Sequence, residues 1–543
     1  MHSRMPYLLG LLGLVIVGAF FRVGPALSLP LWFDEADTWR SGIIDPATSG
    51  WNAQTGLYEP QAMEYGKFFR WQNHFETAPL TFLLSRISTD LLGTTDEWAM
   101  RLPALLAGLL CIPAAFWLGR VVRDDALGLL AAALITFDPS QVDQSQQCRM
   151  YTTMMLLMLL ALALTIKLVR EPEPGSKAGE INPSSRWLSP VWQWVLLGSL
   201  YGLVLSTTQF SLAVWVGIAL GGFGLLVLGL ITGQPHPKTR QVIVGLTCAF
   251  LVAIMLANVG IHSIVHRVFV GGGGDRMDLT YGQMVREIVV AAKDLFDLTI
   301  AGLVLYLLAA VGLVLLFKKC KTSTAILCGV AIANVLMLFS FLRIHHFMDI
   351  RYLSPMQPAI YIGLAMFALG FTRLALRRAA LAIVILFIAM QAWQSTQLTR
   401  YYMQSDRYVF TRAIQQAKAD LKPGETMSIY PGVGCILGQY YQCPQDVKLF
   451  TSLYDLYSHG PLPTQKVPMD FNATGVRLVL GMYNHETATG EQKKKRSQLI
   501  RMIAAHYGAT VDDAKLEVHL KQHHVTTAHI TSQGVQLSSQ GVE

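Results

Sequence analysis

The chain has 543 residues, of which 52% are hydrophobic and only 14% are charged. Soluble domains carry about 25% charged residues, so this composition excludes most soluble enzymes, and the high apolar content excludes a disordered chain. The 43 basic and 35 acidic residues give a net charge of +8. We assign this excess to the cytoplasmic loops of a membrane protein rather than to nucleic-acid binding. The fold class predicted is therefore a polytopic α-helical membrane protein.

Apolar runs in the first 400 residues are long enough to cross a bilayer. We predict about eleven spans, at 7–27, 99–119, 125–141, 150–169, 191–209, 211–232, 242–263, 297–317, 323–342, 354–371 and 379–395. The first is expected to be an uncleaved anchor, since no convincing small-residue cleavage site follows it. Pro79 to Leu92 is apolar but short and contains Arg86 and Asp90, which favours a helix lying at the membrane interface.

The distribution of basic residues predicts the orientation of the chain. A cytoplasmic N-terminus puts clusters such as Lys318 to Lys321 inside, whereas counting Pro79 to Leu92 as a span would put them outside. The predicted domains are a transmembrane domain, 1–396, with a first external loop at 28–98, and an external, periplasmic domain at 397–543.

The region after Ser405 contains no further span and is expected to fold as a small α/β domain. Its predicted elements are a helix from Tyr408 to Leu421, short strands at Met427 to Tyr430, Val447 to Phe450 and Val476 to Leu480, a helix from Gln492 to Tyr507 stopped by Gly508, and a last strand from Leu516. Cys435 and Cys443 lie in this region, where an oxidising compartment would allow either a disulfide or two free thiols.

An acidic cluster follows the first span. Asp34, Glu35 and Asp37 occur within four residues and are flanked by Trp32 and Trp39. Carboxylates at a membrane face are costly to desolvate unless they are paired or bind a cation. Asp34 and Asp37 would share one face of a helix, which favours a functional site; the alternative is an interfacial aromatic belt with an acidic first helical turn.

Together with this cluster, four further segments resemble the GT-C superfamily of membrane glycosyltransferases. They are Glu76-Thr77-Ala78-Pro79-Leu80, Arg101-Leu102-Pro103, Asp138-Pro139 with Ser145 to Tyr151, and Arg351-Tyr352-Leu353-Ser354-Pro355 with Pro358. The resemblance is nearest to the branch with protein O-mannosyltransferases (glycosyltransferase family 39) and the lipid A aminoarabinose transferase. It covers residues 1–370 and loosely includes the tail. The acid of one family motif is replaced by Gln147, for which Asp138 or Asp143 would be substitutes.

The resemblance implies transfer of a sugar from a polyprenyl-phosphate donor to an acceptor hydroxyl at the external membrane face. It implies Asp34 as the base, with Glu35 or Asp37 orienting it. Arginines at external span ends need an anionic partner. The resemblance makes that partner the donor phosphate, held by Arg149, Arg351 and Tyr352; snorkelling to ordinary head groups is the alternative.

The resemblance also implies a possible divalent metal, Mg, Mn or Zn, and no nucleotide. Glu76 and His74 would hold this metal together with a histidine from a later loop, His262 or His266.

Two other functions remain open: a transporter or flippase for lipid-linked saccharides, and a binder that performs no transfer. A transporter is expected to show inverted repeats or charges near mid-span, whereas the polar residues here cluster at external span ends. The expected partners are the polyprenyl-phosphate sugar, membrane lipids and a lipid, glycan or protein acceptor. The expected location is a bacterial inner membrane.

Overall fold

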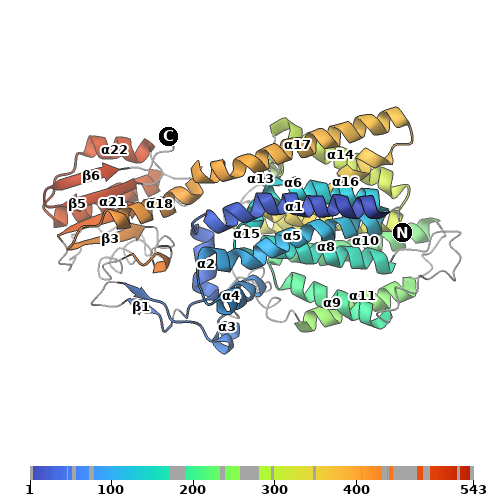
Figure 1. Ribbon diagram of the computed structural model, residues 1–543, viewed down its shortest axis with the longest axis horizontal. Helices are drawn as coiled ribbons and strands as arrows, with labels where there is room; N and C mark the ends of the chain where they lie inside the picture. Colours follow the sequence, from blue (N-terminus) through green and yellow to red (C-terminus); the bar gives the residue numbers. More distant parts are fainter. Residues whose placement is uncertain are drawn as a thin grey trace. The chain divides into compact units, whose positions relative to one another are not determined.

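The computed structural model describes residues 4–45, 47–51, 57–72, 79–169, 190–232, 239–256, 281–294, 299–345, 350–404, 406–430, 437, 439–443, 474–480, 490–522 and 526–538. They form two compact units (Figure 1). The membrane unit comprises Met1–Ser28 and Tyr65–Gln397, and the C-terminal unit comprises Leu29–Glu64 and Leu398–Glu543. The predicted division near residue 397 stays a prediction. The structure adds that the segment after the first span packs with the C-terminal part of the chain.

The membrane unit is helical and apolar. Its helices are α1 (Met5–Ser28), α3 (Tyr65–Gln72), α4 (Leu80–Leu92), α5 (Glu97–Val122), α6 (Asp125–Phe137), α7 (Pro139–Ser145), α8 (Met150–Val169), α9 (Pro190–Leu205), α10 (Leu212–Thr232), α11 (Thr239–Leu256), α13 (Tyr281–Asp294), α14 (Thr299–Phe317), α15 (Lys321–His345), α16 (Gln357–Gly370) and α17 (Leu374–Gln404), with 3₁₀ turns η3 (Gln209–Ser211) and η5 (Ile350–Met356). Among the described residues, six helices are long and apolar enough to cross a membrane, and shorter apolar helices occur at α6, α9, α10, α11 and α14. These helices coincide with the eleven predicted runs, which confirms a helical membrane protein.

The short apolar stretch before the second long helix is a separate element. It forms α4, which ends at Gly93 in the left-handed conformation, φ 66°. Arg86, on the buried side of this helix, pairs with Asp90 one turn later at 2.8 Å. This pair satisfies the two charges that interrupt the apolar sequence.

Helices α14 and α16 approach each other closely because glycines line their contact. A methyl group added at Gly363 would lie 2.5 Å from the carbonyl oxygen of Ala309, and one added at Gly312 would overlap the carbonyl of Gly363. Small residues allow helix backbones to pack closely where apolar burial alone does not drive association.

The glycine contact predicts a local effect on stability. Replacing Gly312 with Ala is expected to destabilise the protein by about 1–3 kcal/mol, because the overpacked helices must separate. Gly222→Ala is the matched control, since a methyl group there meets nothing within 4 Å. Thermal unfolding of the detergent-solubilised protein measures both variants. Equal unfolding temperatures for the two would contradict this packing argument.

The C-terminal unit contains a four-stranded mixed sheet in the order β3 (Glu425–Tyr430), β4 (Gly475–Leu480), β5 (Thr526–Thr531), β6 (Gly534–Ser538). β3 and β4 are parallel, and the other pairs are antiparallel. One face packs on α21 (Gly490–His506) and α22 (Asp513–Gln522), with Val476, Leu478 and Ile530 in the shared core. Helix α18 (Asp406–Ala419) contacts β3, β4 and β5 (Figure 1). The predicted α/β tail is therefore present as a small mixed sheet with helices.

The predictions for the individual tail elements have different outcomes. The helix before Pro423, the strands at β3 and β4 and the helix stopped by Gly508, φ 66°, are confirmed. The strand predicted from Leu516 is wrong, because this segment is helix α22. Leu516 and Leu520 are buried and Val518 is 53% exposed, so the apolar side chains used by the core recur every four residues, not every two. The strand predicted at 447–450 lies outside the described residues.

Of the two cysteines of the tail, the structure describes only one. Cys443 is a buried free thiol, and Cys435 lies outside the described residues.

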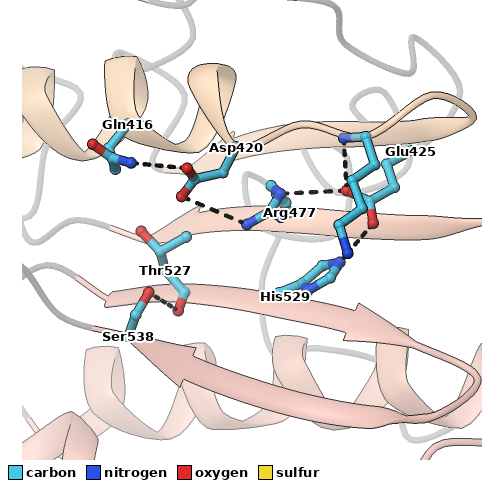
Figure 2. Close-up of polar contacts among 8 residues, drawn as sticks. Gln416, Asp420, Glu425, Arg477, Thr527, His529 and Ser538 are labelled. Atoms are coloured by element: carbon cyan, nitrogen blue, oxygen red, sulfur yellow. Dashed lines mark hydrogen bonds and ion pairs between the residues drawn. The ribbon is translucent and has the colours of Figure 1, made fainter.

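A polar network lies on the α18 face of the sheet. Glu425 accepts hydrogen bonds from the backbone N–H of Lys422 at 3.1 Å and from Arg477 at 3.3 Å, and its other oxygen lies 2.8 Å from His529 (Figure 2). Burial acts to raise the pKa of Glu425, but these hydrogen bonds and the charges of His529 and Arg477 outweigh it and hold the pKa below its ordinary value.

The lowered pKa gives this network a predictable pH dependence. The ionised carboxylate stabilises the folded unit fully above its unfolded pKa, about 4.3, and this contribution is lost as the pH falls through the folded pKa. Glu425→Gln is expected to cost about 1–3 kcal/mol at pH 7 and progressively less in acid. Unfolding followed as a function of pH tests this. Glu517→Gln, in an exposed pair with Arg501, is the control and should change stability by less than about 1 kcal/mol. A pH-independent difference between wild type and Glu425→Gln would contradict the assignment.

Candidate functional site

The acidic cluster lies at the start of helix α2 (Phe33–Gly42), with Asp34 and Glu35 in its first turn and Asp37 just after it. Trp32 is extended, φ −104°, ψ 170°, and its backbone N–H donates to Glu35 at 3.3 Å, so Glu35 closes the start of the helix. Acidic residues are favourable here because unpaired N–H groups make a helix N-terminus electropositive. The sequence therefore folds locally into a helix with two carboxylates in its first turn and a third, Asp37, in its second.

These three carboxylates differ in their surroundings. Glu35 is fully buried, whereas Asp34 and Asp37 are half-buried. Asp37 accepts a hydrogen bond from the Ser41 hydroxyl at 3.2 Å. Residues three apart lie on one helix face, so Asp34 and Asp37 form the accessible acidic face and Glu35 points into the unit. Glu35 thus has a structural contact, and the two aspartates are the more exposed carboxylates of the helix.

In the membrane unit, Arg351 lies in the 3₁₀ turn η5, between α15 and α16. Its side chain is buried, 9% exposed, and its guanidinium carbon lies 5.2 Å from the centre of the Tyr151 ring at the start of α8. A cation held over an aromatic face in a desolvated place is orientated rather than mobile.

The side chain of Tyr352, the next residue, packs against a different aromatic ring from that of Arg351. Its ring stacks on Phe210 of η3, with ring centres 4.3 Å apart and planes at 19°. Asn334 of α15 donates to the Tyr352 carbonyl at 3.1 Å. The aromatic ring of Tyr352 thus anchors the turn that carries Arg351.

Polar side chains from α7 hold η5 and the start of α16. Gln141 donates to Gln357 at 2.7 Å, and Gln144 lies 3.5 Å from the Ser354 hydroxyl. The Ser354 hydroxyl in turn donates to the carbonyl of Arg351 at 2.7 Å. The segment 139–145 and the Arg351 turn therefore form one polar assembly within an apolar bundle.

The residues near Gln147 distinguish the two proposed substitutes for the missing family acid. Gln147 donates to Asp143, one helical turn earlier. Asp138 is fully buried and caps α7 by accepting from the N–H of Ser140 at 2.8 Å. Asp143, which is half-buried and in contact with Gln147, is the carboxylate nearer to the motif position. Arg149 is half-buried just after this turn.

Two residues that the sequence analysis did not single out contribute to this region. Tyr361 of α16 donates to Asp138, and Arg22 of α1 donates to the carbonyls of Ile135 and Thr136, both at 3.1 Å. Arg22 is fully buried inside a predicted span. An intramembrane arginine is by itself a reason to expect a partner, and this signal was available in the sequence. Tyr361 gave no such signal, because aromatic residues are common in apolar helices.

The proposed metal ligands His74, Glu76, His262 and His266 lie outside the described residues. Within the described part of the chain, no group of three or more His, Cys, Asp or Glu side chains is arranged to hold a metal ion. The described residues therefore offer no site that fits the predicted metal.

Comparisons with known proteins show what the chain is similar to. Residues 76–176 match the family PMT_2, described as dolichyl-phosphate-mannose-protein mannosyltransferase. A comparison with curated protein sequences finds no match.

Solved structures share the fold. ArnT from Cupriavidus metallidurans bound to undecaprenyl phosphate is 14% identical, with a TM-score of 0.53 over 88% of this chain and 93% of that chain. The oligosaccharyltransferase of Archaeoglobus fulgidus in complex with zinc and sulfate is 15% identical, with a TM-score of 0.52 over 90% of this chain and 69% of that chain. The same organism's AglB, in complex with an inhibitory peptide and a dolichol-phosphate, is 12% identical, with a TM-score of 0.51 over 99% of this chain and 74% of that chain.

The family match and the shared fold agree with the resemblance to membrane glycosyltransferases found in the motifs. The chain is a helical membrane protein in which residues 76–176 are similar to PMT_2, and it has the fold of ArnT and AglB.

Proposed function

We propose that this protein transfers a sugar from a polyprenyl-phosphate donor to an acceptor hydroxyl at the external face of the membrane. The observation that carries the proposal is the fold shared with ArnT, crystallised with undecaprenyl phosphate, over nearly the whole of both chains. AglB, with the same fold, was crystallised with a dolichol-phosphate. A lipid phosphate is thus the ligand common to these relatives, and it suits a buried arginine in an apolar bundle.

In the proposed reaction, the acceptor oxygen forms a bond to the anomeric carbon while the bond from that carbon to the phosphate oxygen breaks. The acceptor proton passes to the carboxylate of Asp34, and the bonding electrons leave with the polyprenyl phosphate. The half-buried position of Asp34 at the start of α2 supports its role as base. Asp37, on the same helix face, would orient the acceptor.

Negative charge grows on the leaving phosphate as the bond breaks, and a fixed cation lowers the energy of this transition state. We assign this role to Arg351, with Arg149 and the Tyr352 turn completing the phosphate site. The planar guanidinium donates to two oxygens of one phosphate group. The burial of Arg351 over Tyr151 supports the assignment, because a desolvated cation interacts more strongly with an anion than an exposed one.

The proposal also includes a divalent metal. His74, Glu76 and either His262 or His266, which lie outside the described ranges, would hold it. When bound, it would neutralise phosphate charge in the same way as an arginine. Among the described residues, the carboxylates and histidines do not converge on a metal site, so the proposed reaction uses only the described side chains.

The proposed topology follows from the eleven apolar helices and the basic loops. All eleven cross the membrane, α4 lies at the interface, and the C-terminal unit is external, in the periplasm of a bacterium. The acceptor is a lipid, a glycan or a protein with a free hydroxyl.

The proposal is tested with purified protein in detergent or nanodiscs and a panel of radiolabelled polyprenyl-phosphate sugars. We expect transfer to an added acceptor, or hydrolysis onto water, for at least one donor. Binding of the donors without release of polyprenyl phosphate from any of them would reject the enzymatic function and favour a binder or transporter.

A further inference from the structure

The backbone of Leu31, three residues before Asp34, is held by two side chains from the C-terminal part of the same unit. The Leu31 N–H donates to the Tyr441 hydroxyl at 2.7 Å, and the Leu31 carbonyl accepts from the Thr411 hydroxyl at 2.7 Å. Leu31 and Thr411 are both fully buried. Both backbone hydrogen-bonding groups of Leu31 are therefore satisfied by residues that follow it by about four hundred positions in the chain.

The two clamping residues are themselves anchored. Thr411 belongs to α18, which packs on the sheet. The Tyr441 carbonyl accepts from Lys418, also of α18, at 2.6 Å. Tyr441 lies in a helical turn whose flanking residues Leu437 and Cys443 are fully buried. The two hydroxyl groups thus belong to residues that are packed and hydrogen-bonded within the unit.

The other end of α2 has a second contact with the same turn. Trp39, 3% exposed, meets the Tyr440 ring edge-on, with ring centres 5.4 Å apart and planes at 84°. An aromatic pair of this geometry is favourable beyond the area it buries. The acidic helix is therefore held at both ends by the turn that contains Tyr440 and Tyr441.

From these contacts we propose that the C-terminal domain positions the acidic helix α2. Tyr441 and Thr411 form a clamp on Leu31, the Leu31 clamp, and act as positioning residues for Asp34. The inference rests on the proposed function for its catalytic consequence. The clamp gives the tail an indirect part in the reaction, because it sets where the base lies without touching the donor or the acceptor.

A local hydrogen-exchange measurement tests the clamp without reference to activity. Tyr441→Phe removes one hydroxyl and keeps the ring, and Thr411→Val removes the other. In the full-length protein, each variant should increase exchange of the amide hydrogens in the segment 29–42 by about 10-fold, because the loss of either hydrogen bond to Leu31 makes local opening of the segment easier. Thr411→Ser keeps the hydroxyl and should retain wild-type protection. Tyr507→Phe, at the end of α21, is the control for the loss of a tyrosine hydroxyl elsewhere in the unit. Unchanged exchange in both clamp variants, or equal changes in Thr411→Ser and Thr411→Val, would overturn the clamp.

A double-mutant cycle tests the catalytic consequence, with the donor that wild-type protein turns over. Tyr441→Phe and Thr411→Val should each lower kcat by about 10- to 100-fold, since small displacements of a reacting group have effects of this size. Affinity for undecaprenyl phosphate should stay within about twofold, because the clamp does not bind the donor, and Thr411→Ser should restore kcat. In an Asp34→Asn background, the clamp variants should cause little further loss, since residues that act as a unit are not additive.

The outcomes separate the two proposals. An equal loss of kcat in the wild-type and Asp34→Asn backgrounds would overturn the positioning role. If wild-type protein turns over no donor, the proposed function fails, and the exchange measurement still decides whether the clamp exists.

Discussion

Replacing Asp34 with Asn is expected to lower kcat/KM for sugar transfer by about 10²- to 10⁴-fold, the range that a positioned general base contributes. The amide is nearly the same size as the carboxylate but cannot accept the acceptor proton. Steady-state kinetics with a saturating acceptor and a varied donor would measure the change. Binding of undecaprenyl phosphate should be retained, because the loss falls on proton transfer.

The neighbouring carboxylates provide matched controls. Asp37→Asn keeps the side-chain volume and the contact with Ser41, and its effect should be smaller than that of Asp34→Asn. Glu35→Gln alters a buried contact that begins the helix and should therefore lower stability as well as activity. If Asp37→Asn abolished transfer and Asp34→Asn retained the full rate, the assignment of the base would move to Asp37.

Replacing Arg351 with Ala is expected to lower kcat by about 10²- to 10³-fold, comparable to the loss of one fixed donor to a developing anion. Affinity for undecaprenyl phosphate should fall too, because the same guanidinium meets the phosphate in the ground state. Arg351→Lys should recover only part of either loss, since a lysine has a point charge and lacks the planar fork. Isothermal titration and single-turnover kinetics on the same preparation measure the two quantities.

The control for charge removal is Arg286→Ala on α13, where the arginine is exposed. It should leave both quantities unchanged. Tyr151→Leu removes the ring beneath the guanidinium and should produce a smaller loss than Arg351→Ala, because the charge remains but is less well orientated. Full activity in Arg351→Ala, or an equal loss in Arg286→Ala, would contradict a specific role for Arg351 at the phosphate.

The membrane helices were predictable because their signal is local. An apolar run of about 20 residues satisfies its own backbone hydrogen bonds as a helix, whatever surrounds it. Each predicted run therefore corresponds to a helix, with ends that differ by a few residues. Helix α4 was predictable as a short helix, since its apolar run and its charged pair are both visible in the sequence, and its place at the membrane interface stays a prediction.

Elements of the tail were less predictable because their apolar patterns are short. The alternation of Leu516, Val518 and Leu520 fits both a strand and a helix until burial shows which side chains meet the core. Whether such a segment forms a strand or a helix depends on tertiary packing, because the conformation that buries its apolar side chains in the core is favoured.

Contacts between residues that are distant in the chain could not be predicted from the sequence. The motifs singled out Asp34 and Arg351, but neither Tyr441 and Thr411 on Leu31 nor Gln357 against Gln141 gave a local signal. Each of these pairs joins segments more than two hundred residues apart. Their proximity is a property of the fold, whereas the acidic cluster is a property of eight consecutive residues.

The central claim is that this protein breaks the bond between the sugar and the phosphate of a lipid-linked donor with Asp34 as base. It is tested most directly by single-turnover release of polyprenyl phosphate from a bound donor by wild type and Asp34→Asn, with donor affinity measured on the same samples. We expect equal donor affinity in the two proteins, and release of polyprenyl phosphate at least about 100-fold slower in Asp34→Asn. Donor that stays intact in wild type while it moves between the two leaflets of a vesicle would contradict the account and identify a transporter.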